Sequence, residues 1–170
     1  MKELKDLIFT YKDFPKKGID FKDVLGIIQC PEIFRKLIFK MCSSEIVKSS
    51  EAIISVDARG FIFGSAIAFH SSKPMIVARK PGKLPGKIIE QKYDLEYGKN
   101  SLSIQEKSLE KYKSFAIIDD LLATGGTVQC VASLLRANYK EIKGLITVVE
   151  LDDLKGRKRF DFPVESIISY

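Results

Sequence analysis

The stretch "IIDDLLATGGT", Ile117–Thr127, joins an apolar run to two adjacent carboxylates and a pair of glycines. Successive side chains of a strand point to opposite faces, so Asp119 and Asp120 cannot both enter one apolar core. We therefore expect both carboxylates to project where a strand ends. At about 4 Å, two like charges repel by about 4 kcal/mol at an effective dielectric of 20. Such a pair needs hydrogen-bond donors or a cation, which vicinal sugar hydroxyls or Mg²⁺ would supply.

A glycine turn follows the acidic pair. Gly125 and Gly126, flanked by Thr124 and Thr127, precede a segment whose apolar residues recur at helical spacing. The free N–H groups at the start of a helix point outward and bind anions. Carboxylates for hydroxyl groups beside N–H groups for a phosphate predict a pocket for a ribose 5-phosphate. Taken alone, "TGGT" would favour a purely structural interpretation, in which the turn only ends a strand and caps a helix.

Short β-branched runs alternate with helical spacing around this stretch. The expected strands are "AIISV" (52–56), "PMIVA" (74–78), "FAIID" (115–119) and "GLITVVEL" (144–151). Helical spacing lies between them, at 61–69 and 127–138, so we predict an α/β fold with a central parallel sheet flanked by helices. Ligands of such sheets bind beyond the carboxyl ends of the strands. Asp57–Gly60 and Asp119–Thr127 should therefore meet at one crevice.

The length of 170 residues suits a single domain, 1–170. Within it we expect an N-terminal hood, 1–47, built from helical pieces around a loop. The α/β core spans 48–151, and a C-terminal segment, 152–170, follows it. Inside the core, 83–105 fits neither a strand of the sheet nor a helix, and we expect a β-ribbon that folds over the crevice as a lid.

Composition excludes several classes of protein. No apolar run reaches the length of a membrane span and the N-terminus lacks a signal peptide, so we expect a cytoplasmic protein with no membrane partner. Three widely spaced cysteines argue against a disulfide framework and a zinc site. The single histidine, His70, argues against most Ser-His-Asp catalysis. The net charge of +6 favours an anionic partner, either nucleic acid or a phosphorylated small molecule.

As one unit, the strand, the acidic pair and "ATGGT" resemble the phosphoribosyl-diphosphate signature of the purine/pyrimidine phosphoribosyltransferase family. Further blocks are similar to those of the adenine phosphoribosyltransferases, in the same order: "GIDFKDVLGIIQCP" (18–31), "DARGFIFGSAIA" (57–68), "ARKPGKLPGKIIEQKYDLEYGKNSLSIQ" (78–105) and "VVELDDLKGR" (148–157). The resemblance covers nearly the whole chain. It implies the phosphoribosyltransferase fold, transfer of the 5-phosphoribosyl group from 5-phosphoribosyl 1-diphosphate to adenine, Mg²⁺ as the cofactor, and a homodimer.

The resemblance also implies a role for individual residues. Asp119 and Asp120 would bind the ribose hydroxyls, and Mg²⁺ would be held mainly by substrate oxygens, with a water-mediated contact to one of these two carboxylates as an option. Arg59 would help the diphosphate to depart. Glu96 would exchange a proton with the purine or stabilise a cationic ribose. The other assignments are Ala123, Thr124, Gly125, Gly126 and Thr127 for the 5-phosphate; Ala58, Arg59, Gly60 and Lys83 for the diphosphate, with Arg79, Lys80 and Lys87 as further basic residues; Phe21, Lys22 and Leu121 for adenine; and Tyr97 in the lid.

Three residues depart from the family pattern. Asp20 stands where an apolar residue is common, Lys22 where Arg is usual, and Asp57 where Glu is frequent. If main-chain groups read the base, the first two changes are tolerated, although Lys cannot reproduce a planar bidentate Arg contact.

Two other functions stay open at this point. The same reaction on guanine, hypoxanthine or xanthine would need a different pattern of donors at the base, which side-chain identity does not reveal. A non-catalytic sensor of phosphoribosyl diphosphate would bind nucleic acid, and "KGRKRF", Lys155–Phe160, is the only dense basic tract. The N-terminal segment has no helix-turn-helix pattern and little spare length, so we expect no nucleic-acid partner.

Overall fold

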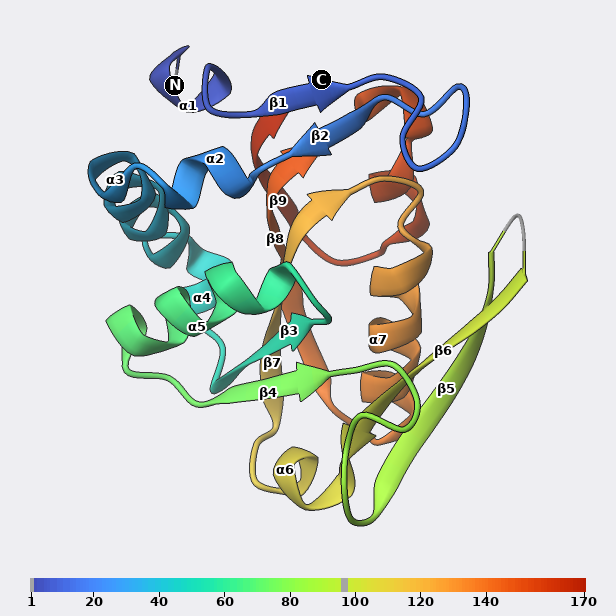
Figure 1. The fold of residues 1–170 in the computed structure, drawn as a ribbon. Coiled ribbons are helices and arrows are strands. Elements are labelled where there is room, and N and C mark those ends of the chain that lie inside the picture. The colour runs from blue at the N-terminus through green and yellow to red at the C-terminus, as the bar shows by residue number, and fades with distance from the viewer. Residues whose placement is uncertain (1, 96–97) are drawn as a thin grey trace.

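A computed structural model describes residues 2–95 and 98–170 of the chain (Figure 1). The helices are α1 (Lys2–Lys5), α2 (Leu25–Ile28), α3 (Pro31–Cys42), α4 (Glu45–Lys48), α5 (Gly60–Ser71), α6 (Glu106–Glu110) and α7 (Gly126–Ala137), with 3₁₀ segments η1 (Asp152–Leu154) and η2 (Gly156–Arg159). The strands are β1 (Phe9–Tyr11), β2 (Phe21–Asp23), β3 (Ala52–Val56), β4 (Met75–Ala78), β5 (Ile88–Leu95), β6 (Gly98–Gln105), β7 (Ser114–Leu122), β8 (Glu141–Glu150) and β9 (Val164–Ser169). Within these two ranges, no helix has both the length and the apolar character needed to cross a membrane.

Five strands form the central sheet in the order β4-β3-β7-β8-β9, and every neighbouring pair is parallel. This arrangement confirms the predicted α/β fold. β3 coincides with the predicted run 52–56, and β4 begins one residue into the run 74–78. β7 is longer at both ends than the predicted run 115–119, and β8 begins three residues before 144. β9 was not predicted, because this edge strand mixes polar with apolar residues.

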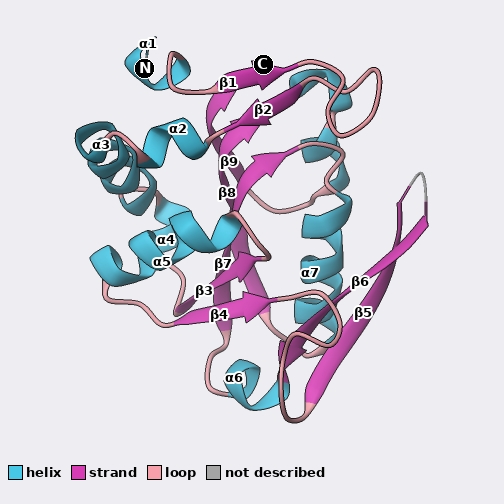
Figure 2. Cartoon of the chain, viewed as in Figure 1, coloured by secondary structure: helices cyan, strands magenta, loops and turns pink. Residues whose placement is uncertain are grey.

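Helices cover both faces of the sheet (Figures 1 and 2). α3 and α5 pack on one face together with Ile53 of β3 and Ile118 of β7. α7 packs on the other face together with Ile54 and Ile117. The side chains of β3 and β7 alternate between two buried layers, which is why both strands begin as apolar runs without polar alternation.

The N-terminal segment is only partly helical, contrary to the expectation for 1–47. α1 to α4 lie within or beside it, but β1 and β2 form an antiparallel ribbon with Phe9 opposite Asp23. Each of these strands has three residues, which is too short for a visible alternation of apolar and polar side chains. The ribbon lies across the end of the molecule near the C-terminus (Figure 1).

The segment predicted as a β-ribbon, 83–105, contains the antiparallel strands β5 and β6. Paired backbone hydrogen bonds between Arg79 and Ser103 connect the ribbon to the end of β4. β5 packs against α7, where Cys130 Sγ lies 3.3 Å from the carbonyl oxygen of Gln91. The ribbon projects beside α7 in Figure 1, and its role as a lid stays a prediction.

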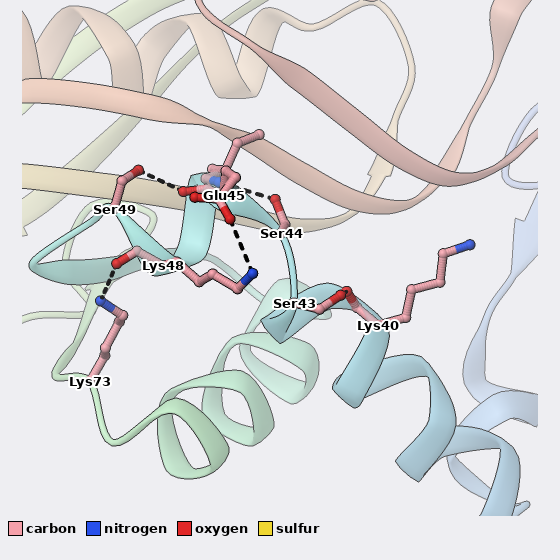
Figure 3. A network of polar contacts seen from close by, with 8 residues as sticks. Lys40, Ser43, Ser44, Glu45, Lys48, Ser49 and Lys73 are labelled. Atoms are coloured by element: carbon pink, nitrogen blue, oxygen red, sulfur yellow. Dashed lines mark hydrogen bonds and ion pairs between the residues drawn. The ribbon is translucent and has the colours of Figure 1, made fainter.

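A short polar network fixes the turn between α3 and α4 (Figure 3). Ser44 caps α4 by accepting a hydrogen bond from the N–H of Ile46 at 3.1 Å. Within that single turn, Lys48 pairs with Glu45 at 3.0 Å. Lys73, which follows α5, donates to the carbonyl oxygen of Lys48 at 3.2 Å. The first two contacts stabilise α4 itself and the third ties it to the segment after α5, while Ile46 and Val47 of α4 are buried.

Candidate active site

The loops that follow β3 and β7 meet at the carboxyl end of the sheet, as the topology predicted. β3 and β7 are neighbours, so their carboxyl ends lie side by side. Between them is a hollow of about 370 Å³. Its lining consists of Val56, Asp57, Ala58, Arg59, Asp119, Asp120, Leu121 and Thr127. The hollow therefore combines residues predicted for the ribose, the diphosphate and the 5-phosphate.

The acidic pair lies inside β7 and not beyond its end, which corrects the expectation that both carboxylates project past the strand. Asp119 is 8% exposed and Asp120 is 6% exposed. Asp119 Oδ1 accepts a hydrogen bond from the N–H of Asp120 at 2.9 Å. A Cβ at Gly60 would lie 2.9 Å from the same oxygen, so only glycine lets α5 begin this close to the acid. Burial, and then the neighbouring charge of Asp120, raise the pKa of Asp119 well above its usual range.

Arg59 supplies the nearest cation to the pair. Its Nε donates to Asp120 Oδ2 at 2.6 Å, and about one third of its side chain is exposed. The same guanidinium lies over the ring of Phe21, with 4.8 Å between the central carbon and the ring centroid. Arg59 thus partly neutralises the acidic hollow from its mouth.

Asp57, one of the departures from the family pattern, is also paired. Arg79 Nε donates to Asp57 Oδ2 at 3.0 Å, and a cis peptide joins Asp57 to Ala58. Lys83 is exposed on the loop after β4 and does not line the hollow, and neither do Lys80 and Lys87. Among the described residues, Arg59 is the one basic side chain that reaches the hollow.

The glycine turn has the conformation that the phosphate site requires. Gly125 has φ +81°, a left-handed conformation that favours glycine, and it stands at the N-cap of α7. Glycine has no side chain to cap the helix, and the N-terminus of a helix is a place where proteins commonly bind anions. Thr127 lines the hollow, whereas the predicted residues 123–126 lie beside it without lining it.

A second hollow, of about 320 Å³, adjoins the first. Its lining consists of Tyr11, Phe14, Phe21, Asp23, Leu25 and Arg59. Phe14 packs edge-on against Phe21, with 5.2 Å between ring centroids. Arg59 lines both hollows, so the aromatic hollow opens beside the acidic one. An aromatic wall of this kind suits the flat face of a heterocyclic base.

Two residues predicted for adenine lie outside this second hollow. The Nζ of Lys22 donates to Thr10 Oγ1 at 2.9 Å and lies 4.3 Å from the ring centroid of Tyr170. The side chain of Lys22 therefore links β2 to the C-terminus, which leaves only its main chain for reading a base. Leu121 lines the first hollow.

Sequence reasoning missed other residues of the aromatic hollow. It did not select Tyr11, Phe14 or Leu25. The aromatic residues of "IFTYKDF", 8–14, were the available signal, because exposed aromatics in a short segment often mark a binding surface.

Comparison with known proteins agrees with this geometry. The family described as "Phosphoribosyl transferase domain" matches residues 27–169. The adenine phosphoribosyltransferase of Prochlorococcus marinus (strain AS9601) is 67% identical over 169 residues, 99% of each chain. The chain belongs to the adenine phosphoribosyltransferase family.

Solved structures of this family have the same fold. The adenine phosphoribosyltransferase of Thermoanaerobacter pseudethanolicus superimposes with a TM-score of 0.92 at 36% identity, covering 99% of both chains. The Saccharomyces cerevisiae enzyme, in complex with an imino-altritol bisphosphate and adenine, gives a TM-score of 0.89 at 33% identity over 98% of this chain and 97% of that one. These likenesses confirm the predicted family and its fold.

The carboxylates of Asp119 and Asp120 have donor chemistry that is suitable for Mg²⁺. Carboxylate oxygens are suitable ligands for Mg²⁺, which takes an octahedral set of oxygens and keeps several waters. In the described ranges, no group of three or more acidic, His or Cys side chains is placed to hold an ion. Asp119 and Asp120 therefore suit an ion that takes most of its ligands from a phosphorylated substrate and water.

Glu96 and Tyr97, predicted for the lid, lie outside the described residues. Their proposed roles in proton transfer and closure stay predictions.

Proposed function

We propose that the protein transfers the 5-phosphoribosyl group from 5-phosphoribosyl 1-diphosphate to adenine, producing AMP and diphosphate, a reaction of purine salvage. The observation that carries this proposal is the position of Arg59 between two hollows. One hollow presents carboxylates and a helix N-terminus, and the other presents aromatic rings. A ribose phosphate in the first and a purine in the second would bring the ribose carbon and the base together.

The described side chains have distinct tasks in this reaction. The N–H groups at the start of α7, with the hydroxyl of Thr127, bind the 5-phosphate. Asp119 and Asp120 accept hydrogen bonds from the ribose hydroxyls, which orients the sugar. Phe21 stacks on the purine.

Arg59 exchanges partners when substrate binds. In the structure its Nε is bonded to Asp120. The diphosphate competes for that guanidinium, and ribose hydroxyls replace it as donors to the carboxylate. A cation fixed on the diphosphate stabilises negative charge on the leaving group as the bond to ribose breaks.

Magnesium is part of the proposal. When bound, Mg²⁺ neutralises diphosphate oxygens and so makes the diphosphate a better leaving group. Asp119 or Asp120 would contact the ion directly or through water. Product formation should be lost when a chelator removes divalent cations, and added Mg²⁺ should restore it.

We also propose a homodimer. Phe69 of α5 is 90% exposed and Phe39 of α3 is 50% exposed, and both line an apolar hollow of about 360 Å³. An apolar surface of this kind supports self-association, because its burial removes apolar area from water. Sedimentation should give twice the chain mass, and Phe69→Asp should shift the protein toward monomer. A monomeric wild type would exclude the homodimer.

A cytoplasmic location completes the proposal. Cys30, Cys42 and Cys130 are free thiols, a state that the reducing cytoplasm maintains. Localisation of a tagged chain by fluorescence would test it.

The reaction is tested with purified protein, Mg²⁺, 5-phosphoribosyl 1-diphosphate and each of adenine, hypoxanthine, guanine and xanthine. Nucleotide and diphosphate are measured in each mixture. AMP from adenine alone is the expected result. A different nucleotide would overturn the base assignment, and tight binding of the diphosphate sugar without any product would favour a sensor.

A further inference from the structure

The basic tract Lys155–Phe160 lies against residues 123–127, which we call the 5-phosphate loop. A Cβ at Gly156 would lie 2.1 Å from the carbonyl oxygen of Ala123, so η2 and the loop are in backbone contact. A Cβ at Gly125 would lie 2.9 Å from Phe160 Cζ and 3.1 Å from the carbonyl oxygen of Gly156. Neither glycine can take a side chain without moving the other segment. The loop that receives the phosphate is therefore supported from behind by this tract.

A buried carboxylate anchors the tract. Glu150, at the end of β8, is 1% exposed. It accepts hydrogen bonds from Arg157 Nε at 2.7 Å and from Arg157 Nη2 at 2.5 Å. Ser166 Oγ of β9 donates a third at 2.6 Å. Two parallel N–H bonds to one carboxylate fix the angle of the guanidinium as well as its distance.

The anchor is continuous with the strand that carries the acidic pair. In the pairing of β7 with β8, Glu150 lies opposite Leu122, and the N–H of Leu151 donates to the carbonyl oxygen of Leu122 at 2.9 Å. Ala123, which Gly156 contacts, is the first residue after β7. Glu150 is bonded to Arg157, whose chain neighbour Gly156 lies against Ala123. The anchor therefore contacts the loop that follows Leu122.

We propose that Glu150 and Arg157 are positioning residues for the 5-phosphate loop, an inference that rests on the proposed function. Their ion pair holds η2 against Ala123 and Gly125, and η2 keeps the N–H groups at the start of α7 aimed at the phosphate. The tract acts through backbone contact, because Nε and Nη2 of Arg157 are bonded to Glu150 while Gly156 lies against Ala123.

Arg157→Lys is the direct test, because Lys keeps the charge and loses the two-bond fork. The affinity for ribose 5-phosphate, measured by calorimetry, should fall by about tenfold, and KM for 5-phosphoribosyl 1-diphosphate should rise by a similar factor. KM for adenine should stay unchanged, since the aromatic hollow does not contact η2. A purely structural role would alter both KM values or neither.

Arg136→Lys is the matched control. Arg136 of α7 pairs with Asp161, one residue beyond the tract, and both side chains are largely exposed. Its substitution should leave both KM values and the affinity for ribose 5-phosphate unchanged. Equal effects of Arg157→Lys and Arg136→Lys would overturn the inference.

A double-mutant cycle separates positioning from loss of folding. Glu150→Gln, Arg157→Gln and the double variant are compared by ribose 5-phosphate affinity at a temperature where circular dichroism shows each variant folded. If the pair acts as a unit, the double variant should bind no more weakly than the weaker single variant. Additive losses would contradict the inference. Because this readout needs no turnover, a wild type that bound the sugar phosphate but formed no AMP would overturn the proposed function alone.

Discussion

Two buried carboxylates at the carboxyl ends of adjacent strands have opposite surroundings. Glu150 of β8 is bonded by Arg157 and Ser166, and the hydrogen bonds from Arg157 hold its pKa below the usual value. Asp119 of β7 has one backbone N–H donor and the charge of Asp120 beside it, and its pKa is raised. The comparison shows which acid serves the fold. A buried carboxylate with several charged and hydroxyl donors stabilises the fold, whereas a buried carboxylate with a raised pKa beside a second acid is a candidate for a functional site.

The two arginines beside these acids also differ in how many of their N–H groups are bonded to the acid. Arg157 is bonded to Glu150 through two N–H groups, whereas Arg59 uses its Nε for Asp120 and lies at the mouth of the hollow. The first guanidinium is committed to the fold. In the proposed reaction, the second changes partners when the diphosphate binds.

Loss of the exchangeable arginine should have the largest effect. Arg59→Gln removes the cation that stabilises the leaving diphosphate, so kcat/KM should fall by about 10²- to 10³-fold, as for loss of one preorganised donor. Steady-state kinetics with adenine and 5-phosphoribosyl 1-diphosphate measure it. Arg136→Gln serves as the control and should retain wild-type rates. An Arg59→Gln enzyme with normal kcat/KM would show that the guanidinium has no part in the reaction.

Substitution of the under-bonded acid should separate activity from stability. Asp119→Asn removes an acceptor for a ribose hydroxyl, and kcat/KM should fall by about 10- to 100-fold, because hydrogen bonds to charged groups contribute about 1.5–3 kcal/mol. The same variant should melt at a higher temperature than wild type at pH 8.

The pH dependence of stability has a definite sign at Asp119. Its pKa is raised in the folded state, so the folded protein binds the proton more tightly than the unfolded chain. The stabilisation that comes from binding this proton is complete below the pKa of Asp119 in the unfolded chain. It is lost as the pH rises through the pKa of Asp119 in the folded protein. The melting temperature of Asp119→Asn should therefore gain on wild type as the pH rises above about 4. If the difference in melting temperature between the two proteins stayed constant across that range, the pKa of Asp119 would not be raised by folding.

The fully bonded acid should give the reverse pattern. Glu150→Gln should lower the free energy of unfolding at pH 7 by about 1.5–3 kcal/mol, since it weakens bonds to a charged acceptor. The pKa of Glu150 is lowered in the folded state, so this stabilisation is present above the unfolded value and is lost as the pH falls through the folded value. Denaturant unfolding from pH 7 to pH 3 should show the two proteins converging below about pH 4.5. Divergence on acidification would contradict the assignment.

The smallest effect is expected at the third donor. Ser166→Ala leaves both bonds from Arg157 to Glu150 and removes only the hydroxyl at 2.6 Å. The free energy of unfolding should fall by about 1 kcal/mol, with turnover close to wild type. A loss larger than that of Glu150→Gln would place the main support of Glu150 on β9 instead of on Arg157.

The parts of the fold that follow local patterns were predictable. The run at 52–56 and the helical spacing beginning near Thr127 depend on neighbours a few residues away, and both appear as β3 and α7. β9 was missed because it mixes polar with apolar residues, and the β1–β2 ribbon was missed because each of its strands has only three residues. The convergence of Asp57–Gly60 with Asp119–Thr127 was predictable from parallel topology alone.

The sequence by itself determined the chemistry of the site: an acidic pair, a glycine turn before a helix, and an arginine after a neighbouring strand. Only the tertiary structure decided how these charges are paired. Arg59 and Asp120 are 61 positions apart, and no spacing rule connects them. Likewise, nothing in "KGRKRF" indicates that one of its basic residues, Arg157, pairs with the buried Glu150. The physical reason is that secondary structure follows from local hydrogen bonds and side-chain periodicity, whereas the ionisation of a buried acid depends on which distant donors the fold brings within about 3 Å.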